Sequence, residues 1–227
     1  MIRQGGPRAA ALILVMGGAV TGVLGLVLGL LARSVQASFD APLYDVLVAA
    51  YSPGSTWTRL NEAFTVIGDP LPSLWQSLAA AAVFAVLFRA RWWIPAVLMP
   101  LGFVIEYVMQ QGLTYLVARG APPQGIGTWF SGGSARFVVM YGLILFLITL
   151  RWPGISRAWR IVGVISVAVL SFVEGYTRLY LLMHWPTDIP GGWLIGTLLL
   201  GTLIASTLAL VGPAPVGAGR DEPHRMA

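Results

Sequence analysis

The sequence contains no cysteine and no lysine, and charged residues make up only 10% of its 227 positions. The absence of cysteine excludes structural disulfides, thiolate nucleophiles and cysteine-ligated metal. The absence of lysine means that every basic residue is an arginine. These arginines form no run of five or more, so we expect no nucleic-acid partner. The net charge of +5 is better explained by membrane topology and contact with anionic lipids.

Long apolar segments account for most of the chain, which is 57% hydrophobic with a mean hydropathy of +0.78. Six segments approach the ~20 residues needed to cross a bilayer: 9–32, 71–88, 93–118, 135–150, 160–183 and 189–211. Their abundant glycine is compatible with close helix packing in lipid. The sequence therefore predicts an all-α polytopic membrane protein, a six-transmembrane-helix bundle that forms one domain over residues 1–211. The polar segment 212–227 is expected to be a disordered cytoplasmic tail.

The first apolar segment has two interpretations. Small residues at Val35 and Ala37 could form a signal-peptide cleavage site, but the apolar run is about twice the length of a usual signal core. We therefore expect a transmembrane helix. Residues 33–70 are expected to form an extracytoplasmic interfacial segment, in which Trp57 and Leu60 belong to an amphipathic helix.

The distribution of arginines predicts the orientation of the bundle. With the N-terminus in the cytoplasm, nine arginines fall on the inner side and five on the outer side. This arrangement places both termini in the cytoplasm, most simply at a bacterial plasma membrane. It also places residues 119–134 and 184–188 together on the extracytoplasmic side.

Polar residues are concentrated where the fifth apolar segment ends and the sixth begins. Arg178 lies near the end of one predicted helix, His184 terminates it, and Asp188 opens the next helix after Thr187, a plausible N-cap. An aspartate beside one imidazole nitrogen leaves the other nitrogen free as a nucleophile, and a guanidinium can bind two phosphate oxygens. This set suits phosphoryl transfer through a phosphohistidine. The alternative is that His184 and Asp188 only cap helices while Glu174 pairs with Arg178.

The segment "TRLYLLMHWPTD" resembles the third signature of the type 2 phosphatidic acid phosphatase family, S-R-x5-H-x3-D, with Thr177 in place of serine. The following "IPGGWLIG" and the early "FDAPLYD" and "VIGDP" segments are also similar to that family. The resemblance implies a six-helix lipid phosphatase fold, with His184 as nucleophile and Asp188 as the residue that orients it. It implies no metal and no cofactor.

The other two family signatures are altered. In "TYLVARGAPP", Thr114 and Ala121 stand where the family has lysine and arginine, although Arg119 is nearby. In "FSGGSARF", Ser134 stands where the family has its general-acid histidine. Backbone N–H groups of Gly132 and Gly133, before a helix, can still face an anion. Arg119, Arg136 and Arg178 would supply positive charge, so we expect a phosphate site formed by Arg178, Arg119, Gly132, Gly133, Ser134 and Arg136.

Two charged residues allow alternative interpretations. Arg136 is either a displaced phosphate ligand or an arginine that snorkels to the interface. Glu106, in the middle of the third apolar segment, is either a functional intramembrane carboxylate or the partner of a neighbouring helix. Glu174 is expected to orient Arg178.

Two functions follow from these residues. The first is a membrane phosphohydrolase that acts on a lipid phosphate or isoprenyl pyrophosphate at the outer leaflet, which the intact Arg178, His184 and Asp188 favour. The second is a catalytically silent protein that binds or transports a lipid phosphate, or a subunit of an envelope-biosynthesis complex. The lost lysine, arginine and histidine favour this second function. A membrane-protein partner or a homo-oligomer is compatible with both.

Overall fold

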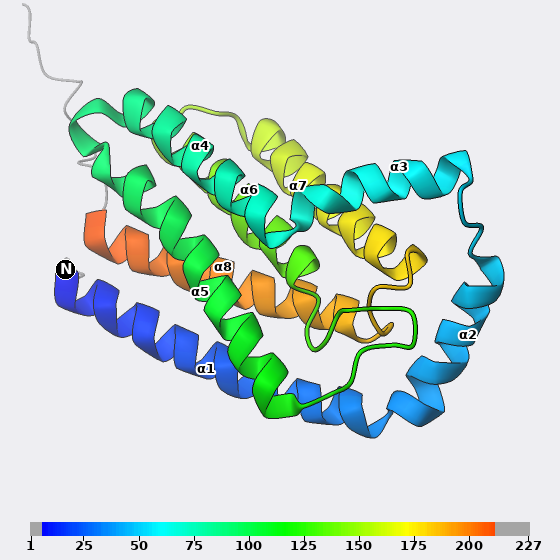
Figure 1. The fold of residues 1–227 in the computed structure, drawn as a ribbon. Helices are drawn as coiled ribbons and strands as arrows, with labels where there is room; N and C mark the ends of the chain where they lie inside the picture. The colour runs from blue at the N-terminus through cyan, green and yellow to red at the C-terminus, as the bar shows by residue number, and fades with distance from the viewer. Residues whose placement is uncertain (1–5, 212–227) are drawn as a thin grey trace, which may run out of the picture.

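The computed structural model describes residues 6–211, and within this range six helices are long and apolar enough to cross a membrane (Figure 1). They are α1 (Pro7–Ser34), α4 (Pro70–Phe88), α5 (Trp93–Val117), α6 (Gly132–Arg151), α7 (Arg157–Tyr180) and α8 (Asp188–Val211). The predicted all-α fold with six candidate spans is thus confirmed. The predicted tail at 212–227 lies outside the described residues.

Helix α6 occupies the centre of the bundle and is buried over most of its length. It packs against α5, α7 and α8, while α1 lies beside α8 and α4 beside α5 (Figure 1). The largest cluster of buried apolar side chains belongs to these central helices and includes Met99, Val139, Leu143, Ile195 and Leu199. The outer face of α1 exposes many large apolar side chains, as expected for a helix in contact with lipid.

Short helices between α1 and α4 cover one end of the bundle. A π-helical turn (Gln36–Asp40) leads into α2 (Ala41–Ala50), and α3 (Thr56–Thr65) follows and packs against α7 (Figure 1). Helix α3 begins at Ser55, whose hydroxyl accepts a hydrogen bond from the Thr58 amide at 3.1 Å. This end also holds the loop from α5 to α6 and the loop from α7 to α8, and we refer to it as the site end.

The helix boundaries at the site end differ from the sequence prediction in one important place. The fifth span was expected to continue to residue 183 and to end at His184, but α7 ends at Tyr180. The reason is local, because Leu182 adopts a left-handed conformation with φ of 59°, which a continuing α-helix does not allow. His184 therefore lies in a loop, where the neighbouring segments, and not helix geometry, fix its side chain.

Candidate active site

His184 and Asp188 lie together in the loop between α7 and α8. The imidazole Nδ1 lies 3.4 Å from Asp188 Oδ2 but has no hydrogen-bond partner. Asp188 Oδ2 instead accepts a hydrogen bond from the Trp185 amide at 3.0 Å. Both side chains are buried. The arrangement places a carboxylate on the Nδ1 side of the ring and leaves Nε2 as the nitrogen that can face a substrate.

Arg119 links Asp188 to the segment before α2. Its Nη1 donates to Asp188 Oδ1 at 3.1 Å, and its Nη2 donates to Asp40 Oδ2. Its Nε donates to Gln36 Oε1 at 3.1 Å. All three charged side chains are completely buried, with 0% of their side-chain surface exposed. Arg119 was predicted to bind phosphate, and in this structure its guanidinium holds two carboxylates.

Thr187 completes this network. Its hydroxyl accepts a hydrogen bond from Arg119 Nη1 at 2.7 Å and donates to Asp40 Oδ2 at 2.9 Å, while its backbone N–H donates to Asp40 Oδ1 at 2.8 Å. The sequence suggested Thr187 as the N-cap of α8. In the structure its hydroxyl instead bridges the Arg119 guanidinium and the Asp40 carboxylate. Asp40 therefore fixes the residue immediately before Asp188.

Backbone hydrogen bonds hold the two site loops together. The Gly127 amide donates to Met183 O at 2.9 Å, and the Ser131 amide donates to Asp188 O at 3.0 Å. The Tyr44 hydroxyl donates to Leu182 O at 3.3 Å. Burial raises the pKa of the Tyr44 phenol, and a hydrogen bond from the Gln124 amide opposes this shift, so the phenol stays protonated and remains a donor at neutral pH. The loop that carries His184 is thus fixed on both sides.

Arg178 forms a second buried network near the end of α7. Its Nε donates to Glu174 Oε1 at 2.8 Å, which is the pair that the sequence predicts. Its Nη2 donates to Asp69 Oδ1 at 2.8 Å and to Thr65 O at 2.9 Å. The Asp69 side chain is 38% exposed, whereas that of Glu174 is fully buried. Asp69 is therefore the partner of Arg178 that solvent, or an anion from solvent, can reach.

The N-terminus of α6 lies against Arg178. A Cβ atom on Gly133 would lie 2.6 Å from Arg178 Nε, so only glycine allows the guanidinium this close to the first turn. Gly132 lies against the Gln110 side chain in the same way. Ser134 is completely buried, and its Oγ lies 2.9 Å from the Oγ of Ser131. The structure thus brings Gly133 and Arg178, two of the residues predicted to bind phosphate, into contact.

Arg136 faces a different part of the bundle. Its Nη1 donates to Glu106 Oε2 at 3.1 Å and to Gln110 Oε1 at 3.0 Å, and its Nε donates to Gly68 O at 3.0 Å. Only 3% of Arg136 is exposed, which contradicts the interpretation as a snorkelling interfacial residue. The same contact shows Glu106 as the partner of a neighbouring helix, because this glutamate bridges α5 to α6 through Arg136.

Thr114, which stands in the place of the family lysine, already uses its hydroxyl in contacts within this chain. Its hydroxyl donates to Trp129 O at 2.7 Å and lies 2.9 Å from the Thr128 hydroxyl. Thr114 therefore attaches the loop between α5 and α6 to the end of α5.

The three arginines predicted to bind phosphate, Arg119, Arg136 and Arg178, are each neutralised by at least one carboxylate within the described residues. Asp40 and Asp188 neutralise Arg119, Glu106 neutralises Arg136, and Glu174 and Asp69 neutralise Arg178. Sequence reasoning did not identify Asp40 or Asp69 as site residues. The available signal was the presence of an aspartate in both of the early segments, "FDAPLYD" and "VIGDP", that resemble the family.

Comparisons with known proteins show which families and folds the chain is similar to. The sequence profile of the PAP2 superfamily matches residues 115–211, a region that contains Arg119, α6, α7 and α8. An undecaprenyl-diphosphatase of Sulfolobus acidocaldarius is 32% identical over 104 residues, which is 43% of this chain and 44% of that protein. A phosphatidylglycerophosphatase B of Bacillus subtilis is 32% identical over 69 residues, which is 30% of this chain and 34% of that protein. The chain thus spans less than half the length of these relatives.

A solved structure establishes the fold more completely. The crystal structure of a transmembrane PAP2 type phosphatidylglycerolphosphate phosphatase from Bacillus subtilis superposes with a TM-score of 0.69. The superposition covers 83% of this chain and 94% of that protein, at 20% sequence identity. The chain therefore has the fold of a PAP2 transmembrane phosphatase.

Proposed function

We propose that the chain is a membrane phosphohydrolase of the PAP2 superfamily that acts on a lipid phosphate or isoprenyl diphosphate. The observation that supports this proposal is the buried unit in which Arg119 holds Asp188 beside the imidazole of His184. A protein that needed only helix caps would not require a charged network at this depth, because burying ions costs several kcal/mol each. The unit lies within the region that matches the PAP2 profile.

We further propose that the site end faces the outside of a bacterial plasma membrane, with both termini in the cytoplasm. The support is the excess of arginines on the opposite side of the six spans. The substrate headgroup would then approach from the outer leaflet.

In the proposed reaction, the lone pair of His184 Nε2 forms a bond to the terminal phosphorus as the bond from phosphorus to the leaving oxygen breaks. The leaving group departs with that electron pair. Asp188 stabilises the positive charge that develops on the imidazole, because its carboxylate lies on the Nδ1 side of the ring. The oxygen of a water molecule then bonds to the phosphorus of the phosphohistidine, and that water loses a proton to solvent. The bond from phosphorus to nitrogen breaks, its electron pair returns to the imidazole nitrogen, and inorganic phosphate is released.

Arg178 is the best placed of the three arginines to bind the transferred phosphate. It lies against the first turn of α6, where Gly132 and Gly133 present backbone N–H groups to an anion beside Ser134. Its exposed partner Asp69 can be displaced by that anion without uncovering a fully buried charge. Arg119 and Arg136, which were also predicted as ligands, would add positive potential while they remain bound to their own carboxylates.

The first prediction concerns the nucleophile. His184→Ala should abolish phosphate release from lipid monophosphates and diphosphates, because no other described residue offers an imidazole. Release of inorganic phosphate by purified protein in detergent, measured over a panel of such lipids, provides the test. His224→Ala is the matched control, since His224 is the only other histidine in the sequence. Equal release by wild type and His184→Ala would exclude the phosphohistidine mechanism.

The second prediction concerns the leaving group. A serine hydroxyl is a poor proton donor, and Ser134 stands where the family resemblance places the general acid. A departing alkoxide needs that proton far more than a departing phosphate does. We expect farnesyl diphosphate to lose phosphate about 10²-fold faster than farnesyl monophosphate, since general-acid catalysis contributes about 10²–10⁴-fold. The two substrates share one tail, so similar rates would show that the chain possesses another acid.

A catalytically silent lipid-phosphate binding or transport protein, or a subunit of an envelope-biosynthesis complex, is the second candidate. One specific observation favours it, because Arg119, Arg136 and Arg178 are already neutralised by carboxylates of this chain. Such a protein would retain vanadate or lipid-phosphate binding but release no phosphate. Binding that depends on Arg178, with no turnover by wild type, would support this second function.

A further inference from the structure

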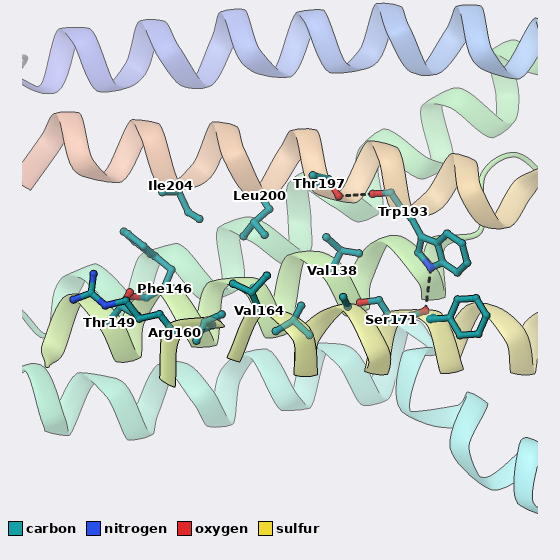
Figure 2. A pocket seen from close by; sticks show the side chains of 15 residues that line it. Val138, Phe146, Thr149, Arg160, Val164, Ser171, Trp193, Thr197, Leu200 and Ile204 are labelled. Carbon is teal, nitrogen blue, oxygen red and sulfur yellow. Dashed lines mark hydrogen bonds between the residues drawn. The ribbon is translucent and has the colours of Figure 1, made fainter. Parts of the chain in front are cut away.

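An apolar groove lies between α7 and α8, on the side of the bundle away from α1. Its volume is about 570 Å³, and it is lined by residues of α6, α7 and α8, among them Val138, Phe146, Val164, Ala168, Trp193 and Leu200 (Figure 2). The groove is open toward the space that lipid occupies around a membrane bundle, because Val164 and Phe172 on its edge are about 60% exposed. A hydrocarbon chain of the surrounding bilayer can therefore enter it from the side.

The groove is closed at the end that points toward the candidate active site. A Cβ atom on Gly175 would lie 2.6 Å from both Ile189 and Trp193, so α7 and α8 are in direct contact there. On the groove side of this contact, Trp193 Nε1 donates to Ser171 O at 2.9 Å. Gly175 precedes Arg178 in α7, and Ile189 lies at the start of α8. The contact therefore separates the groove from the candidate active site.

The charge of the groove lies at its other end. Figure 2 shows Arg160 and Thr149 there, and Arg160 is the only charged residue among the described residues that line the groove. Arg160 also lines a second cavity of about 500 Å³, together with Ser156 and Trp159. Leu145 and Thr149 border both cavities, so the two adjoin beside Arg160. The guanidinium thus lies where the apolar groove reaches the end of the bundle.

Backbone carbonyls, and no carboxylate, hold the Arg160 side chain. Its Nη2 donates to Pro153 O at 2.6 Å and its Nε donates to Ile155 O at 3.1 Å. None of the ion pairs formed within residues 6–211 involves Arg160. A guanidinium has more N–H donors than these two bonds use, so Arg160 can bind an anion without leaving this position.

Other arginines increase the positive charge at this end of the bundle. Arg89 and Arg91 lie between α4 and α5, while Arg151 ends α6 and Arg157 begins α7. Arg151 Nε donates to Leu87 O at 2.9 Å, so the two connections are adjacent. Neither connection contains an aspartate or a glutamate. Tryptophans are typical of the membrane–water interface, and this end exposes Trp92, Trp93, Trp152 and Trp159.

The length of the groove matches one leaflet of a bilayer. Arg160 and Ser171 are eleven positions apart in α7, which corresponds to about 17 Å along the helix axis. The hydrocarbon core of a bilayer is about 30 Å thick, so one leaflet contributes about 15 Å. An acyl chain that begins beside Arg160 therefore ends near Trp193, where the groove is closed.

We propose that Arg160 and the groove bind an anionic glycerophospholipid from the leaflet opposite the site, with its phosphate at Arg160 and one acyl chain along the groove. The second chain would remain in the bilayer, on the open side of the groove. The guanidinium attracts the phosphate, and the apolar lining matches the chain. A zwitterionic headgroup would bring its ammonium among arginines with no acidic residue in either connection, so a net negative lipid is favoured.

A pair of arginine substitutions tests the headgroup site. Titration of purified protein in detergent with phosphatidylglycerol, followed by native mass spectrometry, measures the binding of a single lipid. We expect Arg160→Ala to raise the apparent Kd about tenfold, because charge-assisted hydrogen bonds to phosphate are lost. Arg157→Ala is the matched control, since Arg157 is exposed at the same end but lines neither cavity, and it should change the Kd by less than about twofold. Phosphatidylcholine should bind wild type more weakly than phosphatidylglycerol.

A pair of adjacent substitutions on α7 tests the position of the acyl chain. Val164 lines the groove, whereas its neighbour Ile165 is similarly exposed but lies outside it. We expect Val164→Trp to fill the groove and to raise the Kd for phosphatidylglycerol about tenfold. Ile165→Trp should leave that Kd unchanged.

The controls make each result decisive. Equal weakening by Arg160→Ala and Arg157→Ala overturns the headgroup site, because surface charge in general would then explain the binding. Equal affinity for the two lipids overturns it as well. No effect of Val164→Trp, or the same effect from Ile165→Trp, overturns the placement of the acyl chain in the groove.

Photocrosslinking of wild-type protein locates the lipid without any substitution. Phosphatidylglycerol with a photoreactive group on one acyl chain is incorporated into nanodiscs with the protein, and the labelled residues are mapped by mass spectrometry. Labelling of groove residues on α7 and α8 supports the lipid site even if wild type releases no phosphate, in which case the phosphohydrolase proposal fails alone. Labelling only of the outer face of α1 or α4 overturns the lipid site, whatever the turnover.

Discussion

Arg119→Ala should destabilise the protein by about 3–5 kcal/mol, the usual cost of removing one partner from a buried ion pair. The effect is large because Arg119 lies between Asp40 and Asp188, and all three side chains are inaccessible to solvent. Without the guanidinium, two carboxylates are left in a region of low dielectric with no opposite charge beside them. Equilibrium unfolding in mixed micelles, followed by a conformation-sensitive fluorescence signal, measures this change.

The matched control is Arg33→Ala. Arg33 lies at the same end of the bundle, and its guanidinium donates to the carbonyl of Val117 at 2.9 Å, but the residue is exposed. Its removal should cost less than about 1 kcal/mol. Asp40→Asn should restore part of the stability that Arg119→Ala loses, because one uncompensated charge is removed. Similar losses for both arginine variants, or strict additivity with Asp40→Asn, would show that the network does not stabilise the site.

Asp188→Asn should reduce phosphate release by about 10²–10⁴-fold, chiefly through kcat. Replacing an aspartate that orients a catalytic histidine by asparagine costs about 10⁴-fold in serine proteases, because the imidazole takes the wrong tautomer. In this chain His184 Nδ1 lies 3.4 Å from Asp188 Oδ2 without a hydrogen bond, and such contacts commonly tighten when substrate binds. The initial rates of wild type and variant on one prenyl diphosphate, over a range of concentrations, give the comparison.

Asp40→Asn is the control for this prediction as well. Asp40 shares Arg119 with Asp188 but makes no contact with the imidazole. We expect Asp40→Asn to lower stability while the kcat of the folded fraction falls by less than about tenfold. If Asp40→Asn and Asp188→Asn reduced kcat equally, Asp188 would act only by holding the loop, and its role in orienting His184 would be rejected.

Local features of the sequence were sufficient to predict the framework. Apolar runs near bilayer length predict six spans wherever they pack, because each backbone polar group in lipid must be satisfied within its own helix. The i,i+4 pair of Glu174 and Arg178 could also be predicted, because helix geometry alone brings the two side chains together. The spacing of His184 and Asp188 likewise identified the junction between α7 and α8 as a candidate site before any tertiary information.

The end of α7 shows where local reasoning fails. Apolar character continues past Tyr180, so the sequence predicted a helix to residue 183. In the structure the Met183 amide donates to Arg178 O and the Met183 carbonyl accepts from the Gly127 amide. Contacts with a loop more than fifty positions away stabilise the left-handed turn at Leu182. A hydropathy pattern cannot predict such long-range contacts.

The sequence by itself determined the all-α membrane class of the protein and its six candidate spans, and it supplied His184 as the proposed nucleophile. Only the tertiary structure decided which carboxylate neutralises which arginine: Asp40 for Arg119, Asp69 for Arg178, and Glu106 for Arg136. These partners are separated by 79, 109 and 30 positions along the chain. Hydropathy and helical periodicity report which side of a helix meets lipid or protein, but the pairing of charges depends on how the helices pack around α6. Because a buried charge is tolerated only beside an opposite charge, that packing also determines which arginine has a partly exposed partner: Arg178, through Asp69.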